Sequence, residues 1–197
     1  MRKRTCSRRA FLAAGVTAQA GAGPAWASCA PTPPNAEGPF YLPGAPFRDV
    51  LAPDDEPGER LEIRGRVLGA PDCRPLVGAV LDVWHASAEG FYYNLEGPAD
   101  PQSYGLRGRV AADGESSYSL RTVLPGHYRL TRTRWRPRHL HFRVSHAGYR
   151  TLVTQLHFAG DPHLEGDPFV LPSLVIPLER APGGGLQGTF DVHLGRA

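Results

Sequence analysis

The sequence has few cysteines and no long apolar segment. These two features exclude a zinc finger and argue against a stable membrane span. Only three cysteines occur in 197 residues, and neither Cys29 nor Cys73 stands at metal-ligand spacing with another ligand, which excludes a zinc finger. The apolar run near the N-terminus is too short and too rich in Ala and Gly to stay in a bilayer, so we expect no stable membrane span. No window longer than about ten residues shows a helical period of apolar residues, so helices are not expected to form the core.

Residues 1–28 contain no acidic residue and have the pattern of an export signal, with a basic start, a modest apolar middle and a small-residue end. Residues 7–12, SRRAFL, resemble the twin-arginine motif, so we expect export to a periplasmic or extracellular location. Residues 25–27, AWA, offer a cleavage site. Lipidation of Cys29 is the weaker alternative, because Trp26 stands where lipoprotein boxes carry an aliphatic residue.

Removal of this leader changes the charge of the chain. The formal net charge falls from +3 to −2, because the leader holds five basic residues and no acidic one. A role in binding nucleic acid therefore loses its main support. In an exported chain Cys29 and Cys73 either form a disulfide that ties down the N-terminal segment or remain two free thiols, and the sequence does not decide between them.

The rest of the chain divides into an arm and a β-domain. Residues 29–60 are rich in Pro, Gly and acidic residues and predict an extended arm, and residues 61–197 predict one domain. The fold class is all-β: a sandwich core of mostly antiparallel strands with long loops. Strands are expected at 61–68, 79–86, 117–123, 127–132, 139–145, 150–158, 173–179 and 188–194, and a long loop at 93–109.

The segment RPRHLHF, residues 136–142, places His139 and His141 on the same face of one expected strand. Neutral imidazole suits zinc, copper, iron and nickel, so the pair alone does not select a metal. The other histidines show no order typical of a copper–zinc dismutase, and no Glu follows at the cupin spacing. A two-His-one-carboxylate site would need Asp82 or Asp161 to fold beside the pair.

Two tyrosines at turns are better candidates for the missing ligands. Tyr128 follows a Pro-Gly turn eleven residues before His139, and Tyr92 follows a Gly turn after the 79–86 strand. Phenolate is a hard anionic donor that favours ferric iron over zinc or copper(I). Two histidines and two tyrosines would balance two of the three positive charges of Fe(III).

Several short motifs in series resemble the intradiol ring-cleavage dioxygenases, the group of protocatechuate 3,4-dioxygenase and catechol 1,2-dioxygenase. They extend over residues 37–158, most of the chain after the leader. Each is weak alone, and their order makes the resemblance specific. The motifs are EGPFY (37–41), DVWH (82–85) with GFY (90–92), LRG (106–108), TVLPGHY (122–128), RPRHLHF (136–142) and TQLHF (154–158).

The resemblance implies a non-haem Fe(III) site with Tyr92, Tyr128, His139 and His141 as ligands. It implies cleavage of a catechol between its two hydroxyls by O2, to a cis,cis-muconate-type diacid. Tyr128 would be the labile ligand that takes up a catechol proton. Arg136 and Gln155 would lie beside the substrate ring, where Arg136 stabilises developing negative charge.

The chain also departs from the family pattern. His127, Arg138 and His157 replace the residues that are usual at their positions, with effects on the pocket that the sequence does not define. Tyr93 is adjacent to Tyr92, so a shift of one residue would exchange the ligand, although the spacing from Gly90 favours Tyr92.

No counterpart of the N-terminal helical dimerisation region of catechol and hydroxyquinol enzymes is seen. The chain is therefore more similar to a protocatechuate-type subunit or to short exported members of the group. Which catechol is cleaved, and whether the chain forms a homo-oligomer, stay open.

A second class of protein shares part of these motifs. The segments 65–92 and 113–130 also resemble non-enzymatic β-sandwich binding modules of the carboxypeptidase-regulatory or collagen-adhesin type. Such modules lack the His-x-His strand and have no use for Arg136 or Gln155. That strand therefore favours the enzyme.

Overall fold

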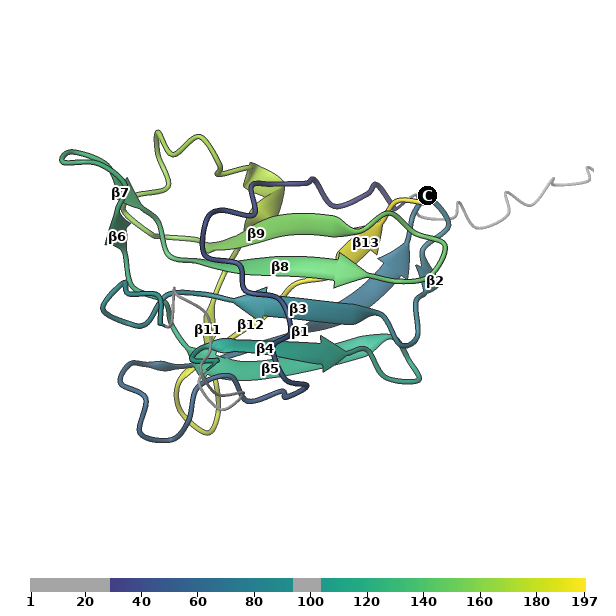
Figure 1. Ribbon diagram of the computed structural model, residues 1–197, viewed down its shortest axis with the longest axis horizontal. Coiled ribbons are helices and arrows are strands. Elements are labelled where there is room, and N and C mark those ends of the chain that lie inside the picture. The colour runs from purple at the N-terminus through teal and green to yellow at the C-terminus, as the bar shows by residue number, and fades with distance from the viewer. Residues whose placement is uncertain (1–28, 94–103) are drawn as a thin grey trace, which may run out of the picture.

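Two β-sheets pack face to face around one apolar core in the residues that the computed structural model describes, 29–93 and 104–197 (Figure 1). The expectations for the 1–28 leader and for most of the 93–109 loop lie outside these residues. The described part of the chain contains no helix long and apolar enough to cross a membrane. The expected all-β sandwich of mostly antiparallel strands is confirmed.

The first sheet is organised around its longest strand, β1. Strand β5 pairs with β1 antiparallel over seven residues, and β12 and β13 pair with the other edge of β1 in parallel. The six strands are β1 (Arg60–Gly69), β2 (Arg74–Pro75), β5 (Ser117–Val123), β11 (Glu179–Arg180), β12 (Leu186–Thr189) and β13 (Val192–Leu194).

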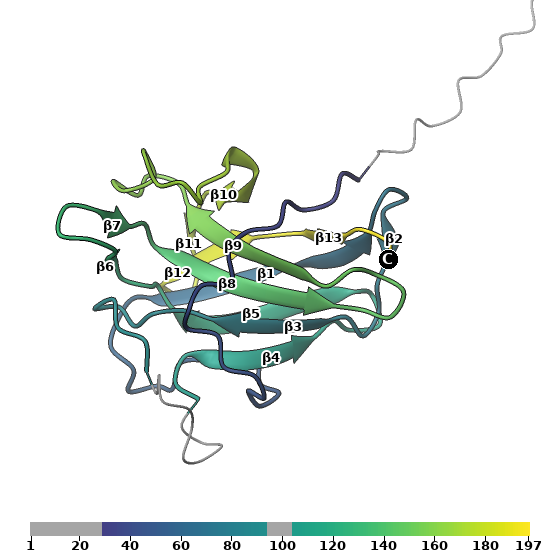
Figure 2. The same cartoon turned by 45° about the horizontal axis from the view of Figure 1, so that its top comes forward.

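The second sheet has the order β10-β9-β8-β3-β4, and only its β10–β9 pair is parallel. A separate two-stranded hairpin, β6–β7, extends from one end of the molecule (Figures 1 and 2). The bounds are β3 (Val80–Trp84), β4 (Arg107–Ala111), β6 (Tyr128–Arg129), β7 (Trp135–Arg136), β8 (His139–Ser145), β9 (Leu152–Phe158) and β10 (Val175–Ile176), which follows the 3₁₀ turn η2 (Pro172–Leu174).

Alternation along β8 gives the second sheet two different faces. Leu140, Phe142 and Val144 point into the core between the sheets and are fully buried. His139 and His141 therefore lie on the opposite face, and they are also buried. A polar face of a sheet can be buried only if another part of the chain covers it.

The N-terminal arm provides part of this cover. It has no strand of its own and crosses the outer face of the second sheet from β9 to β4 (Figure 1). Its hydrogen bonds mark the path: the Asn35 N–H donates to the Val153 carbonyl, the Tyr41 hydroxyl to Asp82, and the Arg48 N–H to the Arg109 carbonyl.

Four expected elements differ from the structure. Residues 107–109, the end of the expected loop, belong to β4, whose first residue Arg107 is buried. The expected strand 127–132 is only the two-residue β6, followed by an exposed turn. Pro177 has no N–H for a ladder and interrupts 173–179. The run 188–194 is divided into β12 and β13, because the Asp191 carboxylate takes the hydrogen bond of the Arg66 N–H.

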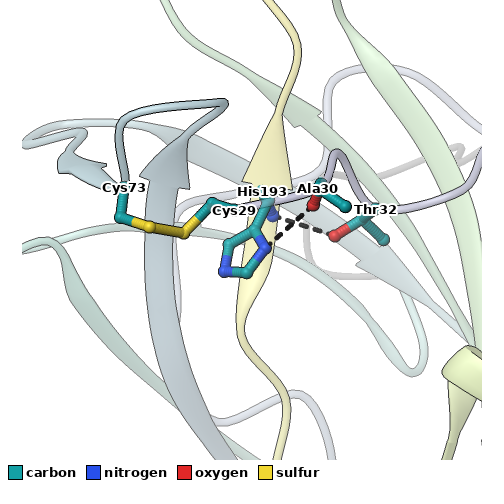
Figure 3. Close-up of a disulfide and its surroundings, with 5 residues drawn as sticks. All are labelled: Cys29, Ala30, Thr32, Cys73 and His193. Carbon is teal, nitrogen blue, oxygen red and sulfur yellow. Dashed lines mark hydrogen bonds between the residues drawn. A yellow bond between two sulfur atoms is a disulfide. The ribbon is translucent and has the colours of Figure 1, made fainter. Parts of the chain in front are cut away.

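A disulfide between Cys29 and Cys73 fixes the start of the arm, with 5.3 Å between the two Cα atoms (Figure 3). The alternative of two free thiols is therefore wrong for this structure. Beside the disulfide, the His193 N–H donates to Thr32 Oγ1 at 2.9 Å, and the Thr32 N–H donates to the His193 carbonyl at 3.0 Å. The arm is thus held by a covalent bond and by pairing with β13.

Loss of the disulfide should destabilise the protein without preventing folding. A Cys29→Ser variant is expected to lose about 4 kcal/mol of the free energy of unfolding, because the bond closes a loop across a sequence separation of 44 in the unfolded chain. Urea denaturation of the variant and of oxidised and reduced wild type measures this loss. Reduced wild type should match the variant, and equal stability of all three samples would contradict the prediction.

Candidate metal centre

The two histidines of β8 face each other with their Nε2 atoms 3.2 Å apart. The His139 Nδ1 atom lies 2.7 Å from the Pro137 carbonyl oxygen. Since a carbonyl only accepts, Nδ1 carries the ring proton of neutral His139, and its Nε2 lone pair points toward His141. The Trp84 ring stacks on His141 with 4.8 Å between centroids and 6° between planes, which fixes the second ring.

Burial keeps both imidazoles neutral. It lowers the pKa of His139 well below its ordinary value, and it lowers the pKa of His141 to about 3, with further lowering by the Arg136 charge. Both rings are therefore uncharged at neutral pH. A neutral imidazole is the form that binds a metal ion.

Tyr92 and Tyr128 complete a four-member cluster with the histidines. Their rings meet edge to face with centroids 5.7 Å apart, and the Tyr128 ring lies 5.7 Å from that of His139. Phe40 of the arm stacks on Tyr92 at 4.1 Å. The buried Tyr92 hydroxyl lies beside that of Tyr128 but completes no hydrogen bond of ordinary geometry with the described residues.

Two glycine turns bring the tyrosines together. The Gly126 N–H donates to the Ser87 carbonyl, so the turn before Tyr92 packs directly on the turn before Tyr128. A Cβ at Gly90 would lie 2.1 Å from the His127 carbonyl oxygen, and one at Gly126 would lie 2.2 Å from that of Ala88. Only glycine permits this approach, which explains the Gly before each tyrosine.

Arg136 is held by three side chains at the edge of the cluster. Its Nε donates to the Asp167 carboxylate at 2.8 Å and its Nη2 to Gln155 Oε1 at 2.7 Å. Its Nη1 lies 3.3 Å from the Tyr128 hydroxyl. Gln155 in turn donates to the Ala36 carbonyl of the arm at 2.7 Å. The guanidinium is therefore fixed in position and points one edge at Tyr128.

Arg107 organises the opposite side of the cluster through backbone carbonyls. Its guanidinium donates to the carbonyls of Tyr93, Gly105 and Phe40 at 2.8, 3.1 and 3.3 Å. The segment that carries Tyr92 and the arm that carries Phe40 are thus bound to one buried cation. Burial lowers the pKa of Arg107, yet an arginine stays protonated under these conditions.

The structure brings together all six residues predicted for the site: Tyr92, Tyr128, Arg136, His139, His141 and Gln155. Tyr93, the register alternative, lies at the surface and donates to Glu56. Neither Asp82 nor Asp161 joins the histidine pair, because Asp82 accepts from Tyr41 and Asp161 from His127.

Three residues of the site were not predicted for it. Asp167 gave no signal, because it acts through a contact between segments far apart in the chain. Arg107 appeared only within the LRG motif, with no role assigned to it. His157 was noted only as a departure from the family pattern. It is fully buried beside His139, with ring centroids 5.6 Å apart, and neither ring nitrogen has a hydrogen-bond partner among the described residues. Burial lowers its pKa to about 4, so this ring too is neutral.

The donor set fits a metal ion that accepts nitrogen and oxygen ligands. Two nitrogens bound about 2.1 Å from one ion at a roughly right angle are about 3 Å apart, close to the observed 3.2 Å. The orphaned Tyr92 hydroxyl supplies a buried oxygen donor beside Tyr128, whose ring lies 5.7 Å from that of His139. Within the described residues no three His, Cys, Asp or Glu side chains form a metal group, so the tyrosines are needed to complete this one.

Comparison with known proteins gives consistent matches. A family model described as Dioxygenase matches residues 36–191. A chlorocatechol 1,2-dioxygenase of Rhodococcus opacus is 37% identical over 165 residues, which are 73% of this chain and 63% of the relative. Catechol 1,2-dioxygenase 2 of Acinetobacter lwoffii is 40% identical over 154 residues, 69% of this chain and 54% of the relative. The chain thus spans little more than half the length of these two relatives.

Solved structures agree with the sequence matches. The dioxygenase domain of a dioxygenase carbohydrate-binding protein fusion from Streptomyces sp. SirexAA-E has a TM-score of 0.71 and 35% identity, covering 85% of this chain and all of that one. The 3-chlorocatechol 1,2-dioxygenase of Rhodococcus opacus 1CP has a TM-score of 0.76 and 28% identity. This match covers 84% of the present chain and 73% of that enzyme's chain.

Asp167→Asn should destabilise the fold strongly, because it leaves the buried Arg136 guanidinium without its anionic partner. The side chains are only 6% and 0% exposed, so we expect a loss of about 3 kcal/mol in the free energy of unfolding by urea denaturation. Asp49→Asn is the matched control. It breaks an arginine–aspartate pair in which both side chains are 61% exposed, and should change stability by less than about 1 kcal/mol. Equal losses in the two variants would contradict the account of Arg136.

Proposed function

Because this chain belongs to the intradiol ring-cleavage dioxygenase family, we propose that it is an enzyme that cleaves a catechol-type ring between its two hydroxyl-bearing carbons with O2. The observation that carries the proposal is the cluster of His139, His141, Tyr92 and Tyr128, in which both neutral imidazoles are buried with their Nε2 atoms 3.2 Å apart. The buried Tyr92 hydroxyl has no hydrogen-bond partner among the described residues, and such an atom is unfavourable unless a ligand completes it.

The same four side chains would hold non-haem Fe(III). In the free protein burial raises the pKa of Tyr92 well above its ordinary value and that of Tyr128 in the same direction, so both phenols are protonated. A nearby multivalent cation reverses this effect and favours phenolate. When bound, ferric iron would supply Lewis acidity that makes a catechol ring reactive toward O2.

Tyr128 is the residue placed to move a proton. It is less enclosed than Tyr92, and its hydroxyl receives a hydrogen bond from Arg136 Nη1 at 3.3 Å. As phenolate, its Oη atom would accept a proton from an incoming catechol hydroxyl, and Arg136 lowers the pKa of this phenol against the effect of burial. Tyr92 has no such partner and, packed under Phe40, would remain a fixed donor.

Arg136 would act on charge that develops during ring cleavage. Asp167 and Gln155 hold its Nε and Nη2, so the guanidinium needs no reorganisation when negative charge appears near Nη1. The arm over Gln155 and the ring of Phe40 exclude water from this region. In the overall reaction the carbon–carbon bond between the two hydroxyl-bearing carbons breaks. Both oxygen atoms of O2 enter the diacid product, which therefore holds every atom of the catechol and of O2, and no further reductant is consumed.

The alternative of a non-enzymatic β-sandwich binding module has less support. Such a module needs no pair of buried histidines, and the family match over residues 36–191 includes all four donors.

Export by the twin-arginine route is a separate proposal that rests on residues 7–12 and is supported by the Cys29–Cys73 disulfide. Structural disulfides persist in oxidising compartments, and a cysteine in a disulfide has no thiol left to carry a lipid. Folding before transport would also permit loading of iron before export.

The iron site is tested by the colour of the protein. Wild type expressed with ample iron should be red-brown from a phenolate-to-Fe(III) transition, and should convert catechol with uptake of O2. Tyr92→Phe and Tyr128→Phe should each shift or weaken the visible band, and Tyr128→Phe should lower kcat at least about 100-fold because it also removes the proton acceptor.

Tyr93→Phe is the matched control for these variants, because it removes the adjacent hydroxyl, which bonds to Glu56 at the surface. Its band and activity should equal those of wild type. A colourless, iron-free wild-type protein would rule out the site, and a band that depends on Tyr93 would move the ligand by one residue.

Export is tested by changing Arg8 and Arg9 together to Lys in the full chain. The variant should accumulate inside the cell in its uncleaved form, while wild type is recovered outside the cytoplasm, as measured by fractionation and immunoblotting. Unimpeded export of the variant would refute the twin-arginine route and leave the catalytic proposal unaffected.

A further inference from the structure

A buried carboxylate outside the donor cluster connects the segments that carry two of its members. Asp161 lies three residues beyond β9, and its side chain is 1% exposed. Its Oδ2 accepts from His127 Nε2 at 2.8 Å and from the Arg138 N–H at 3.0 Å, and its Oδ1 accepts from the His163 N–H at 2.9 Å. The Arg138 Nη1 atom lies 4.0 Å from the same Oδ2.

Each of the two residues that donate to Oδ2 directly precedes a member of the donor cluster. His127 directly precedes Tyr128, and Arg138 directly precedes His139. Tyr128 belongs to the β6–β7 hairpin and His139 to the five-stranded sheet, and these two sheets share no strand. One oxygen atom of Asp161 therefore binds the residue before a tyrosine of the cluster and the residue before a histidine of the cluster.

We propose that Asp161 is a positioning residue for the reaction, which sets the distance between Tyr128 and His139 through its hydrogen bonds to His127 and to the Arg138 N–H. The inference rests on the proposed function. Asp161 acts only through these neighbours and does not touch the donor atoms.

The need for such a link follows from the shape of the hairpin. Strands β6 and β7 pair over only two residues each, and the turn between them is exposed, so the hairpin itself gives Tyr128 little support. The base of the hairpin is packed instead. The His163 ring lies edge-on to His127 with centroids 4.5 Å apart, so the imidazole is held from the side while its Nε2 is held by the carboxylate.

The link also explains why a charged acceptor suits this position. Asp161 accepts two N–H groups on Oδ2 and a third on Oδ1. A neutral amide has only one acceptor oxygen and would therefore suit fewer donors. Hydrogen bonds to a carboxylate are shorter and stronger than those to a neutral oxygen. A shift of this carboxylate would move both donor-bearing segments together.

The test uses iron-loaded full chain with His127 changed in two ways. His127→Phe keeps a ring but removes the N–H, whereas His127→Gln keeps an amide N–H within reach of Asp161. The visible band, the affinity for Fe(III), the melting temperature, and kcat and KM for catechol are measured for each. We expect His127→Phe to shift the band and to lower iron affinity or kcat by about 10- to 100-fold, and His127→Gln to retain most of both.

Two further variants separate positioning from general stability. His146→Phe is the control, since the half-buried His146 lies just beyond the far end of β8, beside the Ala147 and Val77 carbonyls and the Tyr149 ring, and its band should not move. Asp161→Asn should change the band in the same direction as His127→Phe. Adding His127→Phe to Asp161→Asn should have little further effect, because both variants break one link.

The outcomes are distinct. If folded His127→Phe has the band, iron affinity and kcat of wild type, Asp161 does not position the cluster and the inference is overturned. The same holds if His127→Gln is as impaired as His127→Phe. If wild type itself binds no iron, the proposed function fails, and this inference fails with it.

Discussion

The whole site depends on one face of strand β8 being both polar and buried. His139 and His141 point away from the apolar core, so water must be excluded from them by the arm, by the tyrosine turns and by the loop that carries Asp167. Exclusion of water makes each imidazole neutral and each phenol hard to ionise. A cation bound in the cluster would favour ionisation of the phenols, and the resulting phenolates would balance part of its charge.

Burial of this face also explains why the two arginines are bound as they are. Within the described residues, Arg136 is compensated by one buried carboxylate, Asp167, whereas the hydrogen bonds of Arg107 go to backbone carbonyl oxygens. The charge of Arg136 acts on Tyr128 at short range, because Asp167 neutralises it at longer range. Arg107 instead joins several backbone segments through its hydrogen bonds to their carbonyls. The disulfide at Cys29 has a related function, since it fixes the end of the arm whose residues Ala36 and Phe40 cover the donors.

Local signals were sufficient for most of the long strands and for the two histidines and two tyrosines as candidate ligands, because alternation and Gly turns are encoded within about ten residues. Arg136 and Gln155 were predicted only through the resemblance to the family. Asp167 and Asp161 could not be recognised in this way. Asp167 meets Arg136 across 31 positions of chain, and Asp161 meets His127 across 34. Arg138, an unexplained departure from the family pattern, contributes chiefly its backbone N–H, which every residue except proline supplies, so its side chain gave no information about that contact.

His157 illustrates the loss of folding stability that results from burying polar side chains on this face of the sheet. Its ring is fully buried, neutral and without a hydrogen-bond partner among the described residues, a condition that ordinarily costs about 1–3 kcal/mol. An apolar side chain of similar size would avoid that cost. The same sheet face holds another orphaned atom at His141 Nδ1, and the Tyr92 hydroxyl adds one more. Trp84 Nε1 and Arg107 Nε, beside the same region, also lack a partner, and among the described residues Ser116 Oγ is the only such buried side-chain atom that lies elsewhere. The opposite face of β8 carries the apolar side chains of Leu140, Phe142 and Val144. A fold selected for stability alone would separate or pair these groups, so their concentration beside the donors indicates that a ligand completes them.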